Sequence, residues 1–288
     1  MMDGSAEILA GKPVVEAMNF RMQRDVEILK AKGITPMLAI VRVGEKPDDI
    51  SYERGVARRS EQTGVEIHNI RLSEDVSQND LLRTIGELNK EDSVHGILIL
   101  RPLPKQIDDG AVRWALSPEK DVDGITDTSL ASLFTGRREG FAPCTAQACI
   151  EILDYYGVDP LGKHAVVVGR SLVVGKPASM MLSARHATVT ICHTRTVDLP
   201  VVCREADILI VSAGCARLVG AGHLSAGQTV IDVGINVGED GKICGDVDFE
   251  AATGIVGGVT PVPNGVGTVT TSVLLMNTVE AARRLSCA

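Results

Sequence analysis

The residues best suited to chemistry lie in the segment His164-Ala-Val-Val-Val-Gly-Arg-Ser-Leu-Val-Val-Gly-Lys-Pro177. It predicts a buried strand over 165–168, a glycine turn, and a helix that begins near Pro177, whose fixed φ suits a first helical turn. Free backbone N–H groups and the positive end of the helix dipole would then face an anion such as phosphate. The spacing departs from G-x-G-x-x-G, because Ser171 stands where that motif needs glycine. On this segment alone, a nucleotide site and a tight turn of an ordinary α/β sheet are both open.

Bulk composition excludes several classes of protein. A length of 288 residues allows one large or two modest domains. A net charge of −8 and an aromatic content of 3% argue against binding to nucleic acid. We find no apolar run long enough for a membrane span and no signal peptide, so we expect a cytoplasmic protein without membrane contact.

The cysteines and histidines point to no special chemistry. The seven cysteines are an odd number and have no C-x-x-C spacing, so we expect reduced thiols, each a small core residue. The six histidines lack metal-ligand spacing, and we expect no metal.

Strand-like and helix-like patterns alternate along the chain. After an amphipathic helix over about 12–32, we expect strands over 36–43, 65–72 and 96–100, with helices over 49–63 and 78–89 between them. A second series comprises helices over 145–156 and 177–185, strands over 165–168, 188–192, 207–212 and 229–233, and a final helix ending near Leu285. This alternation predicts two α/β domains with mostly parallel sheets and a boundary near 125–145.

Five segments, in order along the chain, resemble the methylenetetrahydrofolate dehydrogenase/cyclohydrolase family. They are Pro118–Gly124, Gly162–Pro177, Ala187–Thr196, Asp232–Asn236 and Thr260–Gly267. The resemblance implies an oxidoreductase of one-carbon metabolism that acts as a homodimer. It implies a folate site in the cleft between an N-terminal parallel-sheet domain, 1–140, and a Rossmann-type NAD(P) domain, 141–268. From the pattern we expect the helix over 269–288 to pack on the first of these domains.

The family's two reactions oxidise 5,10-methylenetetrahydrofolate to the methenyl form and hydrolyse that form to 10-formyltetrahydrofolate. For the folate substrate, the resemblance assigns a stacking role to Tyr52, the pterin-binding carboxylate to Asp123, and further contacts to Pro263 and Gly265. A carboxylate can accept from the paired N–H donors of a pterin. A half-buried helix aromatic and a turn aspartate are the simpler interpretations of Tyr52 and Asp123.

Two catalytic positions of the family have changed in this chain. One helical turn after Tyr52, Val56 stands where the family has its lysine, and Leu100 stands where it has its glutamine. Hydride transfer depends mainly on holding the methylene carbon against the nicotinamide. Hydrolysis also needs a proton shuttle, typically worth ~10²–10⁴ in rate. We therefore expect the dehydrogenase activity, with cyclohydrolase activity weak or absent.

The cofactor expected from the resemblance is NADP, with NAD as a possibility. No acidic residue follows the second strand of the predicted nucleotide-binding unit, 188–192, until Asp198. Arg170 and Arg195, by contrast, could bind a 2′-phosphate. The cofactor contacts implied by the resemblance are Gly169, Arg170, Ser171, Gly175, His193, Thr194, Arg195, Gly214 and Ile235.

Three other functions stay open at this point. One is the full bifunctional enzyme, with the proton shuttle supplied by other residues. Another is a diverged paralogue that uses the folate site for a different one-carbon transfer. The third is a folate- or nucleotide-binding module without turnover.

Overall fold

The computed structural model describes residues 5–137, 139–238 and 241–286 and divides into two compact units. Residues Glu16–Cys144 and those from Thr271 onward form one, which we call the three-stranded unit. Residues up to Val15 and Thr145–Thr270 form the other, the six-stranded unit. Three helices contribute residues to both units, namely α1 (Gly11–Lys30), α6 (Cys144–Tyr155) and α10 (Val266–Leu285).

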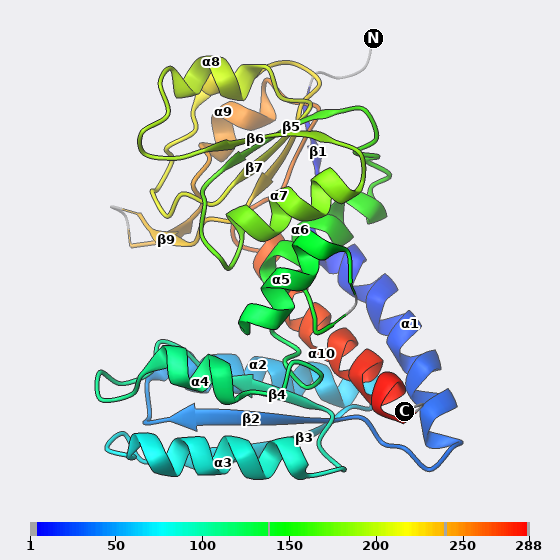
Figure 1. Ribbon diagram of the computed structural model, residues 1–288. Helices are drawn as coiled ribbons and strands as arrows, with labels where there is room; N and C mark the ends of the chain where they lie inside the picture. The colour runs from blue at the N-terminus through cyan, green and yellow to red at the C-terminus, as the bar shows by residue number, and fades with distance from the viewer. Residues whose placement is uncertain (1–4, 138, 239–240, 287–288) are drawn as a thin grey trace. The chain divides into compact units, whose positions relative to one another are not determined.

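The three-stranded unit is built on a parallel sheet in the order β3-β2-β4 (Figure 1). Its strands are β2 (Met37–Val43), β3 (Glu66–Leu72) and β4 (Gly96–Ile99), and its own helices are α2 (Pro47–Thr63), α3 (Gln78–Lys90), α4 (Asp109–Ala115) and α5 (Asp127–Thr135). Side chains of a strand alternate between faces. Ala39 and Val41 therefore share a core with Leu81 of α3 and Val112 of α4, while their neighbour Arg42 turns to the other face.

The helices of this unit begin and end at residue types that favour helix ends. Ser77, Asp108 and Thr126 cap α3, α4 and α5 by accepting a backbone N–H of the first turn. Gly64, with φ 78°, ends α2 in the left-handed conformation that glycine adopts without a steric penalty.

The six-stranded unit has a wholly parallel main sheet in the order β1-β11-β8-β7-β5-β6. Its main strands are β1 (Glu7–Ile8), β5 (His164–Val168), β6 (Thr188–Cys192), β7 (Ile208–Val211), β8 (Thr229–Asp232) and β11 (Gly258–Val259). A small antiparallel pair comprises β9 (Asn236–Val237) and β10 (Ile243–Cys244). The shorter helices are α7 (Gly175–Ala184), α8 (Leu199–Arg204), η1 (Ala221–His223) and α9 (Phe249–Thr253).

Both faces of this main sheet are covered. Val166 and Val168 share a core with Cys203 of α8 and Ala252 of α9. The alternate residues of β5 are equally buried on the opposite face, and Figure 1 draws α7 and α8 on opposite sides of the strands. The strand order places β5, the strand that the glycine turn follows, between β6 and β7. The chain therefore reverses direction across the sheet between β5 and β7, the position at which such sheets bind ligands.

Residues 5–15 belong to the six-stranded unit, whereas the sequence predicted a first domain over 1–140. Glu7 and Ile8 form β1, which pairs with Gly258 and Val259 of β11, so this segment belongs to the six-stranded unit. A strand of two residues has too few side chains to produce a periodic pattern, and its position is set by pairing with a distant segment.

Other differences concern short elements and cysteines. The helices α4, α5, α8 and α9 were not predicted, and α7 begins at Gly175 rather than Pro177. Cys144, Cys149, Cys192 and Cys203 are buried as expected, but Cys215 is exposed and Cys244 only partly buried, so the core prediction is wrong for these two. Cys287 lies outside the described residues. Within the described ranges, no helix is long and apolar enough to cross a membrane.

A buried ion pair joins α2 to the sheet. The Glu53 carboxylate accepts from Arg42 Nε of β2 at 2.9 Å and from Arg71 Nη2 of β3 at 2.6 Å. Arg42 is 5% exposed and Glu53 7%, while the Arg71 side chain is 62% exposed. Arg42 also donates to the Gly44 carbonyl. Because Glu53 follows Tyr52 directly, this pair fixes the rotation of α2 at that residue.

We expect Glu53→Gln to lower the free energy of unfolding by about 3–5 kcal/mol, because it leaves the buried Arg42 guanidinium without its counter-charge. The matched control is Arg71→Gln, which removes the exposed partner and should cost about 1 kcal/mol or less. Urea unfolding of both variants measures the difference. Equal losses of unfolding free energy from the two substitutions would show that the buried partner contributes no more stability than the exposed one.

Candidate functional site

Tyr52 of α2 lies in a cluster with Asp123, Cys144 and Thr271 inside the three-stranded unit. Burial, and next the charge of Asp123, raises the pKa of the Tyr52 phenol, which therefore stays protonated; a hydrogen bond with Thr271 opposes the shift. Burial, and next Asp123, likewise raises the pKa of the Cys144 thiol. The structure thus brings Tyr52 and Asp123 together, although 70 residues separate them in the chain.

Hydrogen bonds to the Asp121 carboxylate hold one part of the loop that carries Asp123. Asp121 is fully buried, and its carboxylate accepts from Ile125 N at 3.0 Å, Thr126 N at 2.8 Å and Ser129 Oγ at 2.6 Å. These bonds close the turn around Gly124. There, an added Cβ would lie 2.5 Å from the backbone N of Pro143, so only glycine fits.

The same loop is also held through Lys120 and Val122. Lys120 Nζ donates to the Leu88 and Glu91 carbonyls at the end of α3. The Val122 carbonyl accepts from Cys144 Sγ at 3.2 Å and from Asn277 Nδ2 at 2.9 Å. The residues on either side of Asp123 are therefore restrained, which fixes the position of its carboxyl group.

Asp123 has an unusual acidity for an aspartate. Burial, and next the nearby Asp121 carboxylate, raises the pKa of Asp123 from 3.8 to about 7. A hydrogen bond with Cys144 and the charge of Arg101 oppose the shift. At neutral pH this carboxyl group is therefore present in both protonation states, so it can accept or donate a proton.

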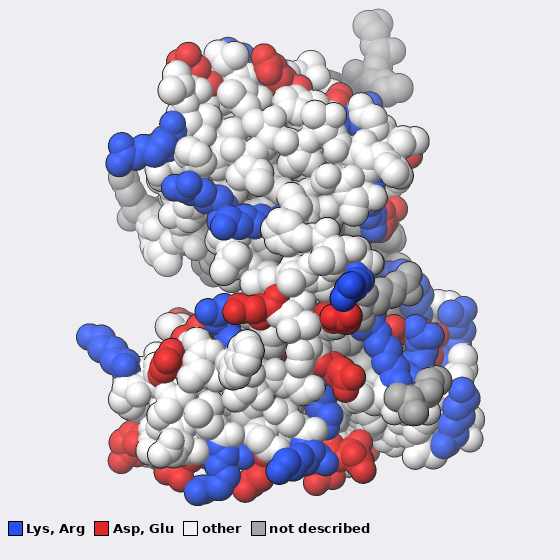
Figure 2. Space-filling view, viewed as in Figure 1, with Lys and Arg blue, Asp and Glu red and all other residues white. Residues whose placement is uncertain are grey.

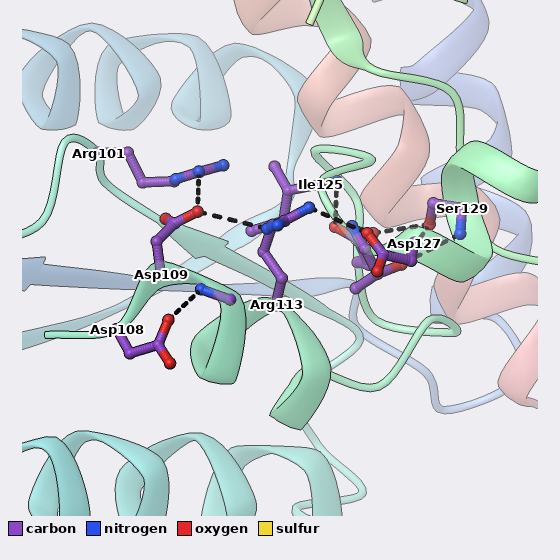
Figure 3. Close-up of polar contacts among 10 residues, drawn as sticks. Arg101, Asp108, Asp109, Arg113, Ile125, Asp127 and Ser129 are labelled. Atoms are coloured by element: carbon purple, nitrogen blue, oxygen red, sulfur yellow. Dashed lines mark hydrogen bonds and ion pairs between the residues drawn. The ribbon is translucent and has the colours of Figure 1, made fainter. Parts of the chain in front are cut away.

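The loop after β4 is tied to this region by a line of charges (Figure 3). Arg101 pairs with Asp109, which also meets Arg113 Nε at 3.3 Å, and Arg113 Nη1 donates to Asp127 at 2.9 Å. Lys46 Nζ donates to the Pro102 carbonyl at 2.6 Å. These contacts restrain the segment that follows Leu100, the position where we expected the family's glutamine to be replaced.

The two positions that were expected to differ from the family are apolar and buried. Val56, one turn after Tyr52 on α2, is fully buried, and Leu100, directly after β4, is 8% exposed. Neither side chain can carry a proton. Among the groups that influence the pKa of Tyr52, only Asp123 is ionised to a substantial degree near neutral pH.

In the six-stranded unit, the glycine turn follows β5 as the sequence predicts. Gly169 has φ 132°, and an added Cβ would lie 2.4 Å from the Ser212 carbonyl oxygen. At Gly175 an added Cβ would lie 2.2 Å from the Gly169 carbonyl oxygen. The segments after β5 and β7 and the start of α7 therefore approach so closely that two glycines are required.

The predicted phosphate ligands lie on adjacent loops of this unit. Residue 168 of β5 pairs with residue 192 of β6, so Arg170 and Arg195 each follow the end of neighbouring strands. Both side chains are exposed, as are Ser171 and Thr194, and His193 is partly buried. Figure 2 shows basic side chains separated by mostly uncharged surface on the visible face of this unit.

The remaining predicted residues of this unit lie in two places. Gly214 follows β7, and Ile235, 70% exposed, follows β8. Pro263 is exposed, whereas Gly265 is buried close to the Pro261 carbonyl. Pro263 and Gly265 belong to the six-stranded unit and Tyr52 and Asp123 to the other, so a shared substrate contact stays a prediction.

Sequence reasoning missed Asp121 and Cys144, which hold the loop around Asp123, and Thr271, which hydrogen-bonds with Tyr52. It also missed Asp246, which accepts from the N–H groups of residues 213–215 after β7. The Asp-x-Asp spacing of 121 and 123, followed by glycine, was a usable signal for a carboxylate-braced turn. The role of Asp246 had no such signal, because its partners come from distant segments. No cluster of three or more His, Cys, Asp and Glu that could hold a metal ion occurs within 5–137, 139–238 and 241–286.

Comparison with known proteins gives matches over both units. The family model for the tetrahydrofolate dehydrogenase/cyclohydrolase catalytic domain matches residues 9–123, and the model for its NAD(P)-binding domain matches 143–286. A curated relative from Carboxydothermus hydrogenoformans, named bifunctional protein FolD, is 48% identical over 283 residues, which cover 98% of this chain and 99% of the relative.

Two solved structures are also similar. The bifunctional enzyme FolD, methylenetetrahydrofolate dehydrogenase/cyclohydrolase, from Campylobacter jejuni is 40% identical with a TM-score of 0.94, over 97% of this chain and 99% of that one. The Trypanosoma brucei N5,N10-methylenetetrahydrofolate dehydrogenase-cyclohydrolase, complexed with NADP and an inhibitor, is 33% identical with a TM-score of 0.91, over 99% of each chain.

The raised pKa of Asp123 predicts a defined pH dependence of stability. Between about pH 4 and pH 7 the folded protein binds more protons at this group than the unfolded chain, so its contribution to stability falls as pH rises. Asp123→Asn removes this titration. Relative to the native protein, the variant should gain on the order of 2–4 kcal/mol between pH 4 and pH 8, at about 1.4 kcal/mol for each unit of pKa. Denaturant unfolding at the two pH values measures this gain, and a stability difference that is independent of pH would contradict it.

Proposed function

Because the chain belongs to the tetrahydrofolate dehydrogenase/cyclohydrolase family, we propose that it oxidises 5,10-methylenetetrahydrofolate to the 5,10-methenyl form by hydride transfer to NADP. The observation that carries the proposal is the glycine turn after β5, at the point where the parallel sheet reverses its strand order. The names of the relatives support the same reaction.

In this proposal, Tyr52 and Asp123 bind the folate. The phenol of Tyr52 stays protonated, so its ring offers an uncharged stacking face. Asp123 accepts from the N–H donors of the pterin, and its position is fixed by the bonds that Asp121 and Val122 make around it. Pro263 and Gly265 complete the proposed substrate contacts.

Arg170 and Arg195 are the proposed ligands of the NADP 2′-phosphate. Both are exposed and follow adjacent parallel strands. No acidic residue follows the second of these strands at the position where an NAD site binds the ribose. The nicotinamide supplies the hydride acceptor, and the residues of this chain hold it and the folate in register. The bound phosphates would lie along the turn at Gly169, Ser171 and Gly175, close to the N-terminus of α7.

The second candidate function adds hydrolysis of the methenyl form. The names of the relatives favour this bifunctional activity over our expectation that hydrolysis is weak or absent. Val56 and Leu100 do not supply the proton shuttle, but Asp123, with a pKa of about 7, is suited to do so. In a bifunctional form of this protein, Asp123 would therefore move the proton as well as bind the pterin.

Two further predictions follow from the family resemblance. The chain is expected to be a homodimer, and the exposed apolar side chains of Val237 and Ile243 in the β9-β10 pair are compatible with contact to a second copy. A cytoplasmic location is likewise expected. Sedimentation in solution and fractionation of cells measure these two properties.

Cofactor preference is testable through Arg170. NADP should bind more tightly than NAD, and Arg170→Ala should weaken NADP by about tenfold or more, since a hydrogen bond to a charged group contributes about 1.5–3 kcal/mol. Affinity for NAD should hardly change. The matched control is Arg83→Ala, which removes the same charge from an exposed ion pair in the other unit. Equal native affinities for the two nucleotides would refute the preference.

The two activities are testable separately by following the methylene and methenyl substrates in independent assays. If Val56 and Leu100 limit hydrolysis, Val56→Lys with Leu100→Gln should raise it by about tenfold or more, because a positioned acid/base group typically contributes ~10²–10⁴ in rate. Val56→Met with Leu100→Met is the control for side-chain size. If the native protein already hydrolyses the methenyl form as fast as it makes it, the bifunctional function holds. The hydrolysis rate should then titrate with a group of pKa about 7.

A further inference from the structure

Two buried aspartates lie beneath the loops that follow β7 and β8. Asp246 is fully buried, and its carboxylate accepts four hydrogen bonds. The donors are Ala213 N at 2.6 Å, Gly214 N at 2.8 Å, Cys215 N at 2.9 Å and Asn236 Nδ2 at 2.9 Å. One side chain therefore ties three consecutive peptide groups after β7 to the segment after β8.

Asp232, at the end of β8, holds Asp246 in turn. Its Oδ1 accepts from Gly234 N and Asp246 N, both at 3.0 Å, and its Oδ2 accepts from Val247 N at 3.0 Å. Asp232 is 3% exposed. Asp232 therefore holds the backbone of residue 246, and the side chain of Asp246 holds the loop after β7.

The fit around this pair leaves room only for glycine at two positions. An added Cβ at Gly234 would lie 2.3 Å from Cγ of Asp246. An added Cβ at Gly245 would lie 1.8 Å from Oδ2 of Asp232. Glycine at these two positions therefore allows each carboxylate to reach its backbone donors.

The loop that Asp246 holds lies at the reversal of strand order. β7 neighbours β5, and Ser212 contacts the position of the missing Cβ of Gly169, the first residue of the glycine turn. Gly214 and Ile235 were both predicted as cofactor contacts, and Asp246 binds the backbone of the first and the neighbour of the second. Since the N–H groups of residues 213–215 donate to Asp246, they are not available to a ligand.

We propose that Asp246 is a positioning residue for the nicotinamide nucleotide. It holds the 213–215 loop and the 234–236 segment as one rigid wall of the cofactor site, with Asp232 as its support. This inference rests on the proposed function, in which that site binds NADP. Asp246 itself makes no contact with the cofactor, because its carboxylate oxygens are occupied by the loops they hold.

The test is Asp246→Asn, which puts an amide NH₂ where one carboxylate oxygen accepted two hydrogen bonds. NADP affinity, measured by titration calorimetry, should fall at least tenfold, and the KM for NADP should rise while the KM for the folate substrate stays the same. Amide hydrogen exchange of residues 213–215 should speed up. The matched control is Asp248→Asn, since Asp248 only caps α9 and asparagine caps equally well. This control should keep the native NADP affinity.

A milder variant covers the case in which Asp246→Asn does not fold. Asn236→Ala removes one of the four bonds and should weaken NADP binding about threefold, again without change in the KM for folate. Unchanged NADP affinity in a folded Asp246→Asn or in Asn236→Ala would overturn the inference. So would equal losses of NADP and folate binding, which indicate a general loss of structure. Failure of the native protein to bind NADP would instead refute the proposed function.

Discussion

A carboxylate removed from water needs several hydrogen-bond donors, and in this chain most of those donors are backbone N–H groups of loops. Asp121 collects Ile125 N, Thr126 N and the Ser129 hydroxyl in the three-stranded unit. Asp246 collects three consecutive N–H groups and an asparagine amide in the six-stranded unit. In both cases the requirement to satisfy one buried carboxyl group fixes the conformation of a loop that has no regular secondary structure.

The same constraint explains the acidity of Asp123. Burial, and next the nearby Asp121 carboxylate, raises the pKa of Asp123 to about 7. One carboxylate thus raises the pKa of another two residues away. Val56 and Leu100 carry no ionisable group, so Asp123 is the group beside Tyr52 that changes charge near neutral pH.

Much of the fold follows from local pattern. The buried strands 37–43, 164–168 and 208–211 are predominantly apolar, as expected for parallel strands covered on both faces, and they were predicted within two residues. Long amphipathic helices such as α1 and α3 were predicted equally well. The short elements were missed, because α4, α5, α8 and α9 each span fewer than ten residues and depend on caps and packing rather than on a sustained period.

By itself, the sequence determined the two α/β units, the glycine turn after β5, and the apolar side chains at Val56 and Leu100. These features reside in local composition and spacing, which a chain displays before it folds. Only the tertiary structure decided that β1 joins the sheet of residues 164–259, that Asp123 lies beside Tyr52 and Cys144, and that Asp246 binds the loop after β7. Each of these depends on hydrogen bonds or burial between segments far apart in the chain, so no local pattern encodes them.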